Sequence, residues 1–141
     1  METLHYLLMK AHSTLNRRIM AGAAALGLSP GQPKVLEYLL ACGQANQKAI
    51  AEYCEIEPAT VGAILQRMEA AGLVRRANRQ GDRRAVYVSL TSAGEQAARR
   101  MEAVFASAEE EAARQLTGGE REQLCALLER LCAAAKGGEQ A

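Results

Sequence analysis

The sequence predicts a mostly α-helical fold with a small β-wing of two or three strands near its middle. Along most of the 141 residues, apolar side chains recur every three or four positions, which is the helical period. Between residues 73 and 90 the period changes to two, which indicates strands. Aromatic residues make up only 4% of the chain, so Leu, Ala and Met must fill the core, and these residues favour helices.

Two helices are predicted before residue 45. The first covers residues 2–26 and carries one apolar stripe, formed by Leu4, Leu8, Ala11, Leu15 and Ile19. Ser29-Pro30 predicts the start of the second helix, with Ser29 as the N-cap, and this helix runs to Ala41. Gly43 is a typical C-terminal stop.

A pair of short helices follows. Asn46 is a candidate N-cap for a helix that continues through Tyr53, and a second helix starts at Pro58 or Ala59 and ends at Ala71, before Gly72. The outer face of this second helix bears small or hydrogen-bonding residues: Ala59, Thr60, Gly62, Ala63, Gln66 and Arg67. Two short helices joined by a tight turn, the second with such a face, are typical of a helix-turn-helix.

The predicted wing consists of strands at 73–78 and 85–90, joined by a loop at 79–84 that is centred on Gly81-Asp82. Thr91 then opens a helix over 92–116, and Thr117 caps a last helix over 120–135. The apolar stripes of the first and last two helices exceed what a chain of this size easily buries, which predicts a homodimer. Residues 1–28 and 92–141 therefore form the expected helical dimerisation region, and residues 29–91 the winged helix-turn-helix DNA-binding lobe.

Charge is unevenly distributed, although the net charge is only +1. Residues 57–100 contain eight basic and four acidic side chains, and every basic one is Arg. Residues 101–141 contain four basic and eight acidic side chains. The planar guanidinium group suits phosphates and base edges, so the middle of the chain is the candidate nucleic-acid surface.

Metal, redox and membrane functions find little support. Cys42, Cys54, Cys125 and Cys132 lack zinc-finger spacing, and we expect Cys125 and Cys132 to be small core residues and the other two to be structural. His5 and His12 lie seven residues apart with no cluster to complete a metal site. No apolar run approaches the roughly 20 residues of a membrane span, and no signal peptide is recognised, so we expect a cytoplasmic protein with free thiols.

The segment from Gln47 to Thr91 resembles the MarR family of bacterial transcriptional regulators. Asp82-Arg83-Arg84-Ala85, followed by Val88 and Leu90-Thr91, is similar to the family's wing signature. The end of the second short helix is similar to the family's recognition helix at Leu65, Met68-Glu69 and Gly72-Leu73-Val74, with Met68 where Leu is usual. The flanking helices match in number, order and length, so the resemblance covers nearly the whole chain.

The resemblance implies a sequence-specific double-stranded DNA-binding regulator of transcription that binds a palindromic operator. Helix 59–71 would enter the major groove, where Thr60, Gln66 and Arg67 reach bases or phosphates. Arg84 would enter the minor groove, oriented by a salt bridge from Asp82, while Arg79 and Arg83 contact phosphates. Gly62 departs from the family, where a hydroxyl residue is common.

The resemblance also implies repression that is released by a small aromatic or phenolic ligand. The ligand would enter the crevice between the dimer helices and the DNA-binding lobe. The candidate lining residues there are His12, Leu15, Ile19, Tyr38 and Met101.

Two other classes of function fit the sequence less well. A winged-helix protein–protein interaction module without DNA binding is the alternative, and the Arg-rich wing argues against it. The sequence contains no Ser/His/Asp arrangement, phosphate loop or metal set, so neither an enzyme nor a cofactor is expected.

Overall fold

The computed structural model describes the backbone of residues 1–79 and 81–139, and the side chains of residues 1–78, 81–82 and 84–134. Within these residues, helices and three strands follow one another along the chain. The elements are α1 (Leu4–Ala25), α2 (Gln32–Cys42), β1 (Gln44–Ala45), α3 (Gln47–Cys54), α4 (Pro58–Ala70), β2 (Val74–Arg79), β3 (Asp82–Leu90), α5 (Ser92–Ala112) and α6 (Gly118–Glu139).

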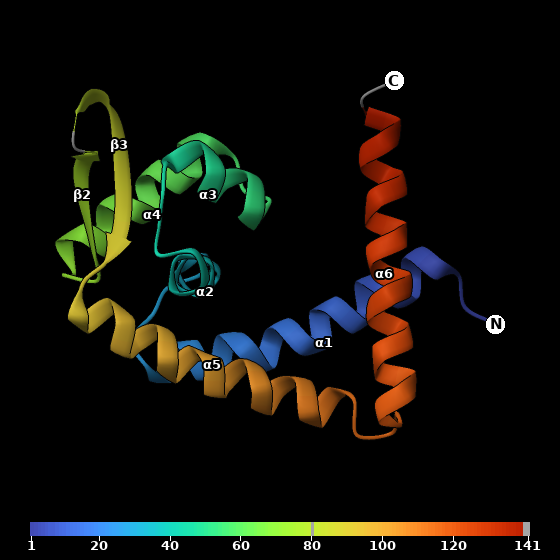
Figure 1. The fold of residues 1–141 in the computed structure, drawn as a ribbon. Helices are drawn as coiled ribbons and strands as arrows, with labels where there is room; N and C mark the ends of the chain where they lie inside the picture. The colour runs from blue at the N-terminus through green and yellow to red at the C-terminus, as the bar shows by residue number, and fades with distance from the viewer. Residues whose placement is uncertain (80, 140–141) are drawn as a thin grey trace.

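The helices form a base and a lobe (Figure 1). α1 and α5 pack against each other in the base, and α2 lies on α5. α3 and α4 lie beyond α2, and the β2–β3 hairpin projects at the end of the lobe. α6 makes few contacts with the rest of the described chain and extends away from the lobe.

One hydrophobic core joins the lobe to the base. Buried residues of α2, α3 and α4, such as Leu36, Ile50 and Leu65, belong to the same cluster as Ala23 of α1 and Met101 of α5. Met101 is fully buried, so its predicted role in a ligand pocket is not supported by its position. Because the core is continuous, the lobe packs directly on the helical base.

Three predicted helix caps are confirmed. The Asn46 side chain accepts a hydrogen bond from the Ala49 N–H at 2.8 Å, and the Thr91 hydroxyl accepts one from the Gly94 N–H at 3.0 Å. At the start of α6 the Thr117 hydroxyl accepts from the Glu120 N–H at 3.1 Å, while the Glu120 carboxylate accepts from the Thr117 N–H at 2.9 Å. These bonds satisfy N–H groups that have no partner within their helices.

The predicted start of the second helix is wrong. α2 begins at Gln32 rather than after Ser29, and its N-cap is Gly31, with φ 90°. A Cβ atom at residue 31 would lie 2.6 Å from Cδ1 of Ile64, and the positive φ would strain any residue with a side chain at this position. Ser29 instead donates its N–H to the Gln32 side chain at 3.1 Å, closing the turn before the helix.

The wing is longer than predicted. β3 starts at Asp82, which pairs with Arg79, so strand replaces most of the predicted loop at 79–84. The pairing of β2 with β3 is irregular between Asn78 and Arg79, where the register of the two strands shifts. A third strand, β1, pairs with β3 through Gln44–Ser89 and Ala45–Val88. Its two residues are too few to show the alternating period of a strand in the sequence, so its position could not be predicted.

The helices near the C-terminus also differ from their predicted bounds. α5 ends at Ala112, four residues before the predicted end, and α6 begins at Gly118. Cys125 and Cys132 are exposed on α6 rather than buried in the core, because α6 packs so little against the chain. No helix in the described part of the chain is both long and apolar enough to cross a membrane.

Candidate nucleic-acid interface

α4 is amphipathic in the way the sequence predicts. Val61, Ile64, Leu65 and Met68 are buried against the lobe, whereas Thr60, Gln66 and Arg67 are exposed. Ala59 and Ala63 are also exposed, and their small side chains leave this face open. The helix therefore presents two hydrogen-bonding side chains and one cation away from the core.

Two side chains from neighbouring elements hold α4. Gln47 of α3 donates its amide Nε2 to the Pro58 carbonyl oxygen at 3.0 Å. Arg76 of β2 donates to the Gly62 carbonyl at 3.5 Å, and its Nε lies 4.0 Å from the Glu69 carboxylate. Sequence reasoning missed both residues, because the contacts join positions 11 and 14 residues apart.

The wing places Asp82 and Arg84 at the surface of the hairpin that extends beyond α4 (Figure 1). The Asp82 carboxylate accepts a hydrogen bond from the Arg84 backbone N–H at 3.0 Å. Among the described side chains the ion pairs do not include Asp82 with Arg84, so the predicted salt bridge is replaced by this backbone contact. Asp commonly bonds the N–H two residues further on, which competes with the salt bridge. The side chains of Arg79 and Arg83 lie outside the described residues.

A cavity of about 550 Å³ lies between α1, α2, α4 and α5. Its described lining includes three of the predicted ligand residues, His12, Leu15 and Ile19. Tyr38 is elsewhere and stacks on Tyr53 with ring centroids 4.4 Å apart. Sequence reasoning missed the remaining lining residues, which are Asn16, Met20, Pro30, Gly31, Pro33, Lys34, Ile56, Ile64 and Phe105.

Thr60 of α4 also lines this cavity. The predicted DNA-binding helix and the predicted ligand crevice therefore share a wall. Lys34 contributes a cation to the lining, and Leu15, Ile19 and Phe105 contribute apolar surface. A planar ligand with an anionic group has matching chemistry in this space.

Next to this cavity lies a smaller acidic one. Its lining contains Glu37 of α2 together with Glu102 and Glu109 of α5. Burial raises the pKa of the Glu37 carboxyl above its usual range, and the charges of Glu109 and Glu102 raise it further. Burial likewise raises the pKa of the Cys54 thiol, which keeps this thiol protonated and suits the structural role predicted for it.

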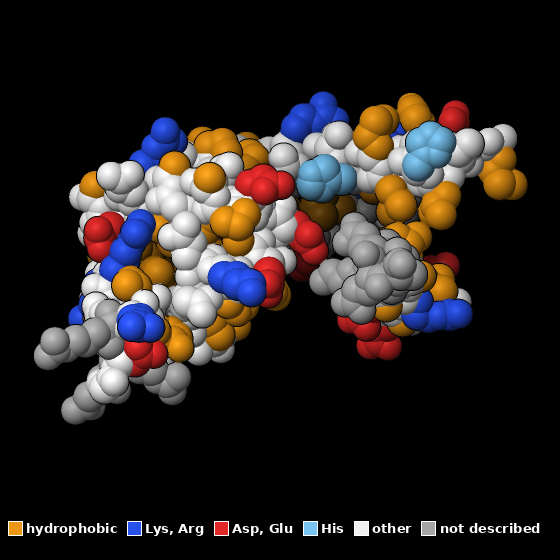
Figure 2. All heavy atoms as spheres, turned by 90° about the horizontal axis from the view of Figure 1, so that it is seen from above, with side chains coloured by type: hydrophobic (Ala, Val, Ile, Leu, Met, Phe, Trp, Pro, Cys, Tyr) orange, Lys and Arg blue, Asp and Glu red, His pale blue; other side chains and the backbone are white. Residues whose placement is uncertain are grey.

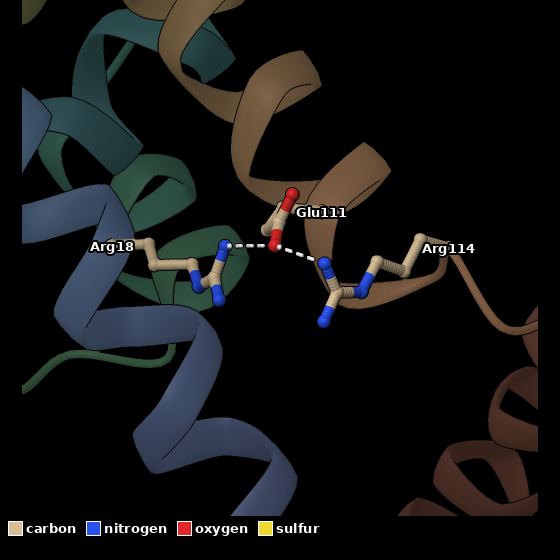
Figure 3. A network of polar contacts seen from close by, with 3 residues as sticks. All are labelled: Arg18, Glu111 and Arg114. Atoms are coloured by element: carbon tan, nitrogen blue, oxygen red, sulfur yellow. Dashed lines mark ion pairs between the residues drawn. The ribbon is translucent and has the colours of Figure 1, made fainter.

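The base is tied together at the end of α5 (Figure 3). The Glu111 carboxylate lies between Arg18 of α1, at 3.5 Å, and Arg114, at 3.2 Å. All three side chains are at least 43% exposed, so solvent screens the pairs and they contribute little stability. They join α1 to the last turn of α5 and to the residue two positions beyond its end.

Large apolar side chains remain exposed at both ends of the chain. Figure 2 shows apolar side chains around the two histidines of α1. On α1 these are Leu4, Leu7 and Met9, and on α6 they are Leu124, Leu127 and Leu131. The three leucines of α6 are 38–48% exposed, which leaves an uncovered apolar stripe on a helix that packs on little else.

Residues 26–85 match the sequence profile of the MarR family. The chain is 27% identical over 128 residues to the HTH-type transcriptional repressor Rv2887 of Mycobacterium tuberculosis, covering 91% of this chain and 92% of that protein. Over 69 residues it is 35% identical to the repressor MdtR of Bacillus subtilis, covering 49% of this chain and 44% of that protein.

Solved structures share the whole fold. A MarR-family transcriptional regulator from Silicibacter pomeroyi superposes with a TM-score of 0.81 at 26% identity, covering 92% of this chain and 87% of that one. Rv2887 in complex with DNA superposes with a TM-score of 0.74 at 25% identity, covering 93% and 98%. Rv2887 in complex with salicylic acid gives 0.74 at 26% identity, covering 93% and 97%. With its helix-turn-helix, its wing and relatives that match nearly its full length, the chain has the fold of the MarR family of transcriptional regulators, whose profile matches residues 26–85.

Proposed function

We propose that this chain is a homodimeric transcription regulator that binds double-stranded DNA with α4 in the major groove and the wing in the minor groove. The observation that carries the proposal is the joint exposure of α4 and the hairpin on one lobe. Thr60, Gln66 and Arg67 point away from the core that fixes α4, and Arg84 is exposed on the adjoining hairpin. The relatives of nearly equal length are repressors, which supports a regulatory role without enzymatic activity.

The test is binding to a labelled random duplex, followed by fluorescence anisotropy as salt is raised. We expect tight binding at low salt and a steep linear loss of log affinity with log salt, because arginines release counterions from phosphates. Arg84→Ala should lower affinity roughly tenfold or more at unchanged melting temperature. Asp82→Ala should lower it less, by releasing the Arg84 backbone. A protein that ignores every duplex at low salt would instead be a protein-interaction module.

The dimer assignment follows from the uncovered apolar stripes. We assign residues 1–28 and 92–141 to dimerisation and 29–91 to DNA binding, because exposed apolar surface is concentrated on α1 and α6. Two recognition helices related by a two-fold axis would meet successive major grooves, roughly 34 Å apart, and read a palindromic operator. Such a protein acts on chromosomal DNA, which supports the cytoplasm as its location.

The ligand assignment rests on the cavity between α1, α2, α4 and α5. We propose that a small aromatic or phenolic acid binds there and releases DNA, because Thr60 and Ile64 of α4 form part of the wall. A ligand can act only if it prefers the state with displaced recognition helices. Lys34 supplies the cation for the acid group.

Salicylate is the direct probe, since Rv2887 has been solved in complex with salicylic acid. Titration should weaken DNA binding by the wild type. Lys34→Gln should raise the half-effective salicylate concentration about tenfold while leaving DNA binding without ligand unchanged, as expected for loss of one charge-assisted bond. Lys48→Gln, which removes an exposed lysine outside this cavity, is the control. Equal responses of the two variants would exclude the Lys34 assignment.

A further inference from the structure

Gln47 holds its side-chain amide in one fixed orientation. It is the first residue of α3, it is half-buried, and its Nε2 donates to the Pro58 carbonyl oxygen in the first turn of α4 at 3.0 Å. A carbonyl oxygen only accepts hydrogen bonds, so the nitrogen of the amide must face Pro58. No other hydrogen bond to a described residue is seen for the Oε1 acceptor or the second N–H donor of the amide, so both can meet another partner.

Gly62 makes room for this amide. A Cβ atom at residue 62 would lie 3.0 Å from Nε2, 3.7 Å from Cδ and 3.9 Å from Oε1 of Gln47. The amide therefore lies in tight contact with the place where a side chain of residue 62 would begin, and a side chain there would push it aside by a few tenths of an ångström.

The Gln47 amide lies next to the exposed face of α4. On a helix surface, residues three and four apart are neighbours, so Gly62 lies beside Ala59 and Gln66. Both of these residues are exposed, and Ala59 is too small to cover the amide. Any duplex that contacts Gln66 from the major groove comes close to the Gln47 amide.

We infer that Gln47 is a further DNA-reading residue, an amide delivered by α3 in place of the side chain that Gly62 lacks. An amide that offers one acceptor and one donor matches the N6 and N7 edge of adenine in the major groove. The bond to Pro58 orders the side chain before binding, so less conformational entropy is lost when it meets a base. This inference rests on the proposed function, because it requires that α4 faces DNA.

The experiment is selection of bound sequences from a randomised duplex pool by the full-length wild type and by variants. Gln47→Ala should lower the preference for adenine at one position of each half-site roughly tenfold, with the preferences at other positions kept. Gly62→Ser should affect the same position, because its Cβ displaces the amide, and the double variant should lose no more than Gln47→Ala alone. Gln66→Ala should change a different position, and Lys48→Ala should change none.

Three results would overturn the inference. If Gln47→Ala lowers affinity equally for all sequences, Gln47 only tethers α3 to α4. If Gly62→Ser affects a different base position, the two residues are not a pair. If Gln47→Ala lowers the melting temperature of the protein, the test is repeated with Gln47→Met, which keeps the length of the side chain without the amide. If the wild type enriches no sequence at all, the proposed function fails together with the inference, which separates that case from the other two.

Discussion

A single guanidinium group joins the wing to the recognition helix. Arg76 of β2 reaches the Gly62 carbonyl and the Glu69 carboxylate of α4, but both contacts are long, at 3.5 Å and 4.0 Å. Its Nε is buried and has no hydrogen-bond partner among the described residues. The Arg76 side chain as a whole is 30% exposed, so its guanidinium group can turn outward, where a DNA phosphate is a stronger acceptor than either of these two partners.

Glu69→Gln tests whether Arg76 can contact a DNA phosphate. Removal of the carboxylate should free Arg76 for phosphate contact, so binding to a random duplex should tighten severalfold and the slope of log affinity against log salt should steepen by about one. Glu52→Gln, an equal charge change on the exposed surface of α3, should alter the slope less. Anisotropy titrations at several salt concentrations measure the affinity and the slope for both variants. Equal slopes would show that the effect of Glu69→Gln comes from the net charge and not from Arg76.

Glu37 predicts a pH effect on stability. Burial beside Glu109 and Glu102 raises its pKa in the folded chain above the ordinary 4.5, so ionisation of this carboxyl opposes folding. Its contribution to stability is fully present below the unfolded pKa and is lost as pH rises through the folded pKa. Glu37→Gln should therefore raise the melting temperature by roughly 1–3 °C at pH 7, a small value because solvent screens the group.

The same variant should show little gain near pH 4, where the Glu37 carboxyl is mostly protonated in both states. Thermal melts followed by circular dichroism across pH 4–7 give the comparison. Glu102→Gln removes one of the two repulsive neighbours and should give a smaller gain. A stabilisation by Glu37→Gln that is the same at every pH would rule out the titration of this carboxyl as its cause.

At the scale of elements, local chemistry decides what the sequence can predict. Asn46, Thr91 and Thr117 mark their helices correctly, because a cap bonds an N–H only three residues away. Gly31 and the two-residue strand β1 could not be placed, because they depend on Ile64 and on β3, which are distant in sequence. The exposed face of α4 could be predicted from the helical period, whereas the contacts of Gln47, Lys34 and Arg76 could not, because their neighbours are distant in sequence.

Asn46→Ala tests the cap of α3, the helix that carries Gln47. Loss of the bond to the Ala49 N–H should destabilise the protein by about 1 kcal/mol. For a chain of this size the melting temperature should fall by roughly 3–5 °C. Asn46→Asp keeps the acceptor and should melt close to the wild type. If the two variants lose equal stability in thermal denaturation, the side-chain bond is not what holds the start of α3.

The whole molecule combines a rigid lobe with a helix that has little to pack against. α6 holds three exposed leucines, and its described side chains are almost all exposed in the single chain. In proteins most of the stability of a helix comes from tertiary packing of its apolar face. A second copy that contributes the same stripe would bury both, which is the self-complementary arrangement of a two-fold dimer.

Leu127→Glu places a charge in the centre of that stripe and should separate the subunits. Light scattering after gel filtration should give twice the chain mass of 15.1 kDa for the wild type and a single chain mass for the variant. Ala126→Glu adds the same charge on the opposite side of α6 and should stay dimeric.

The separated subunit retains its lobe core, since Leu127 is outside it. Each subunit then binds DNA alone, so operator affinity should fall by roughly a hundredfold or more, as expected when one of two linked binding events is lost. A Leu127→Glu protein that keeps the dimer mass would show that α6 does not hold the subunits together.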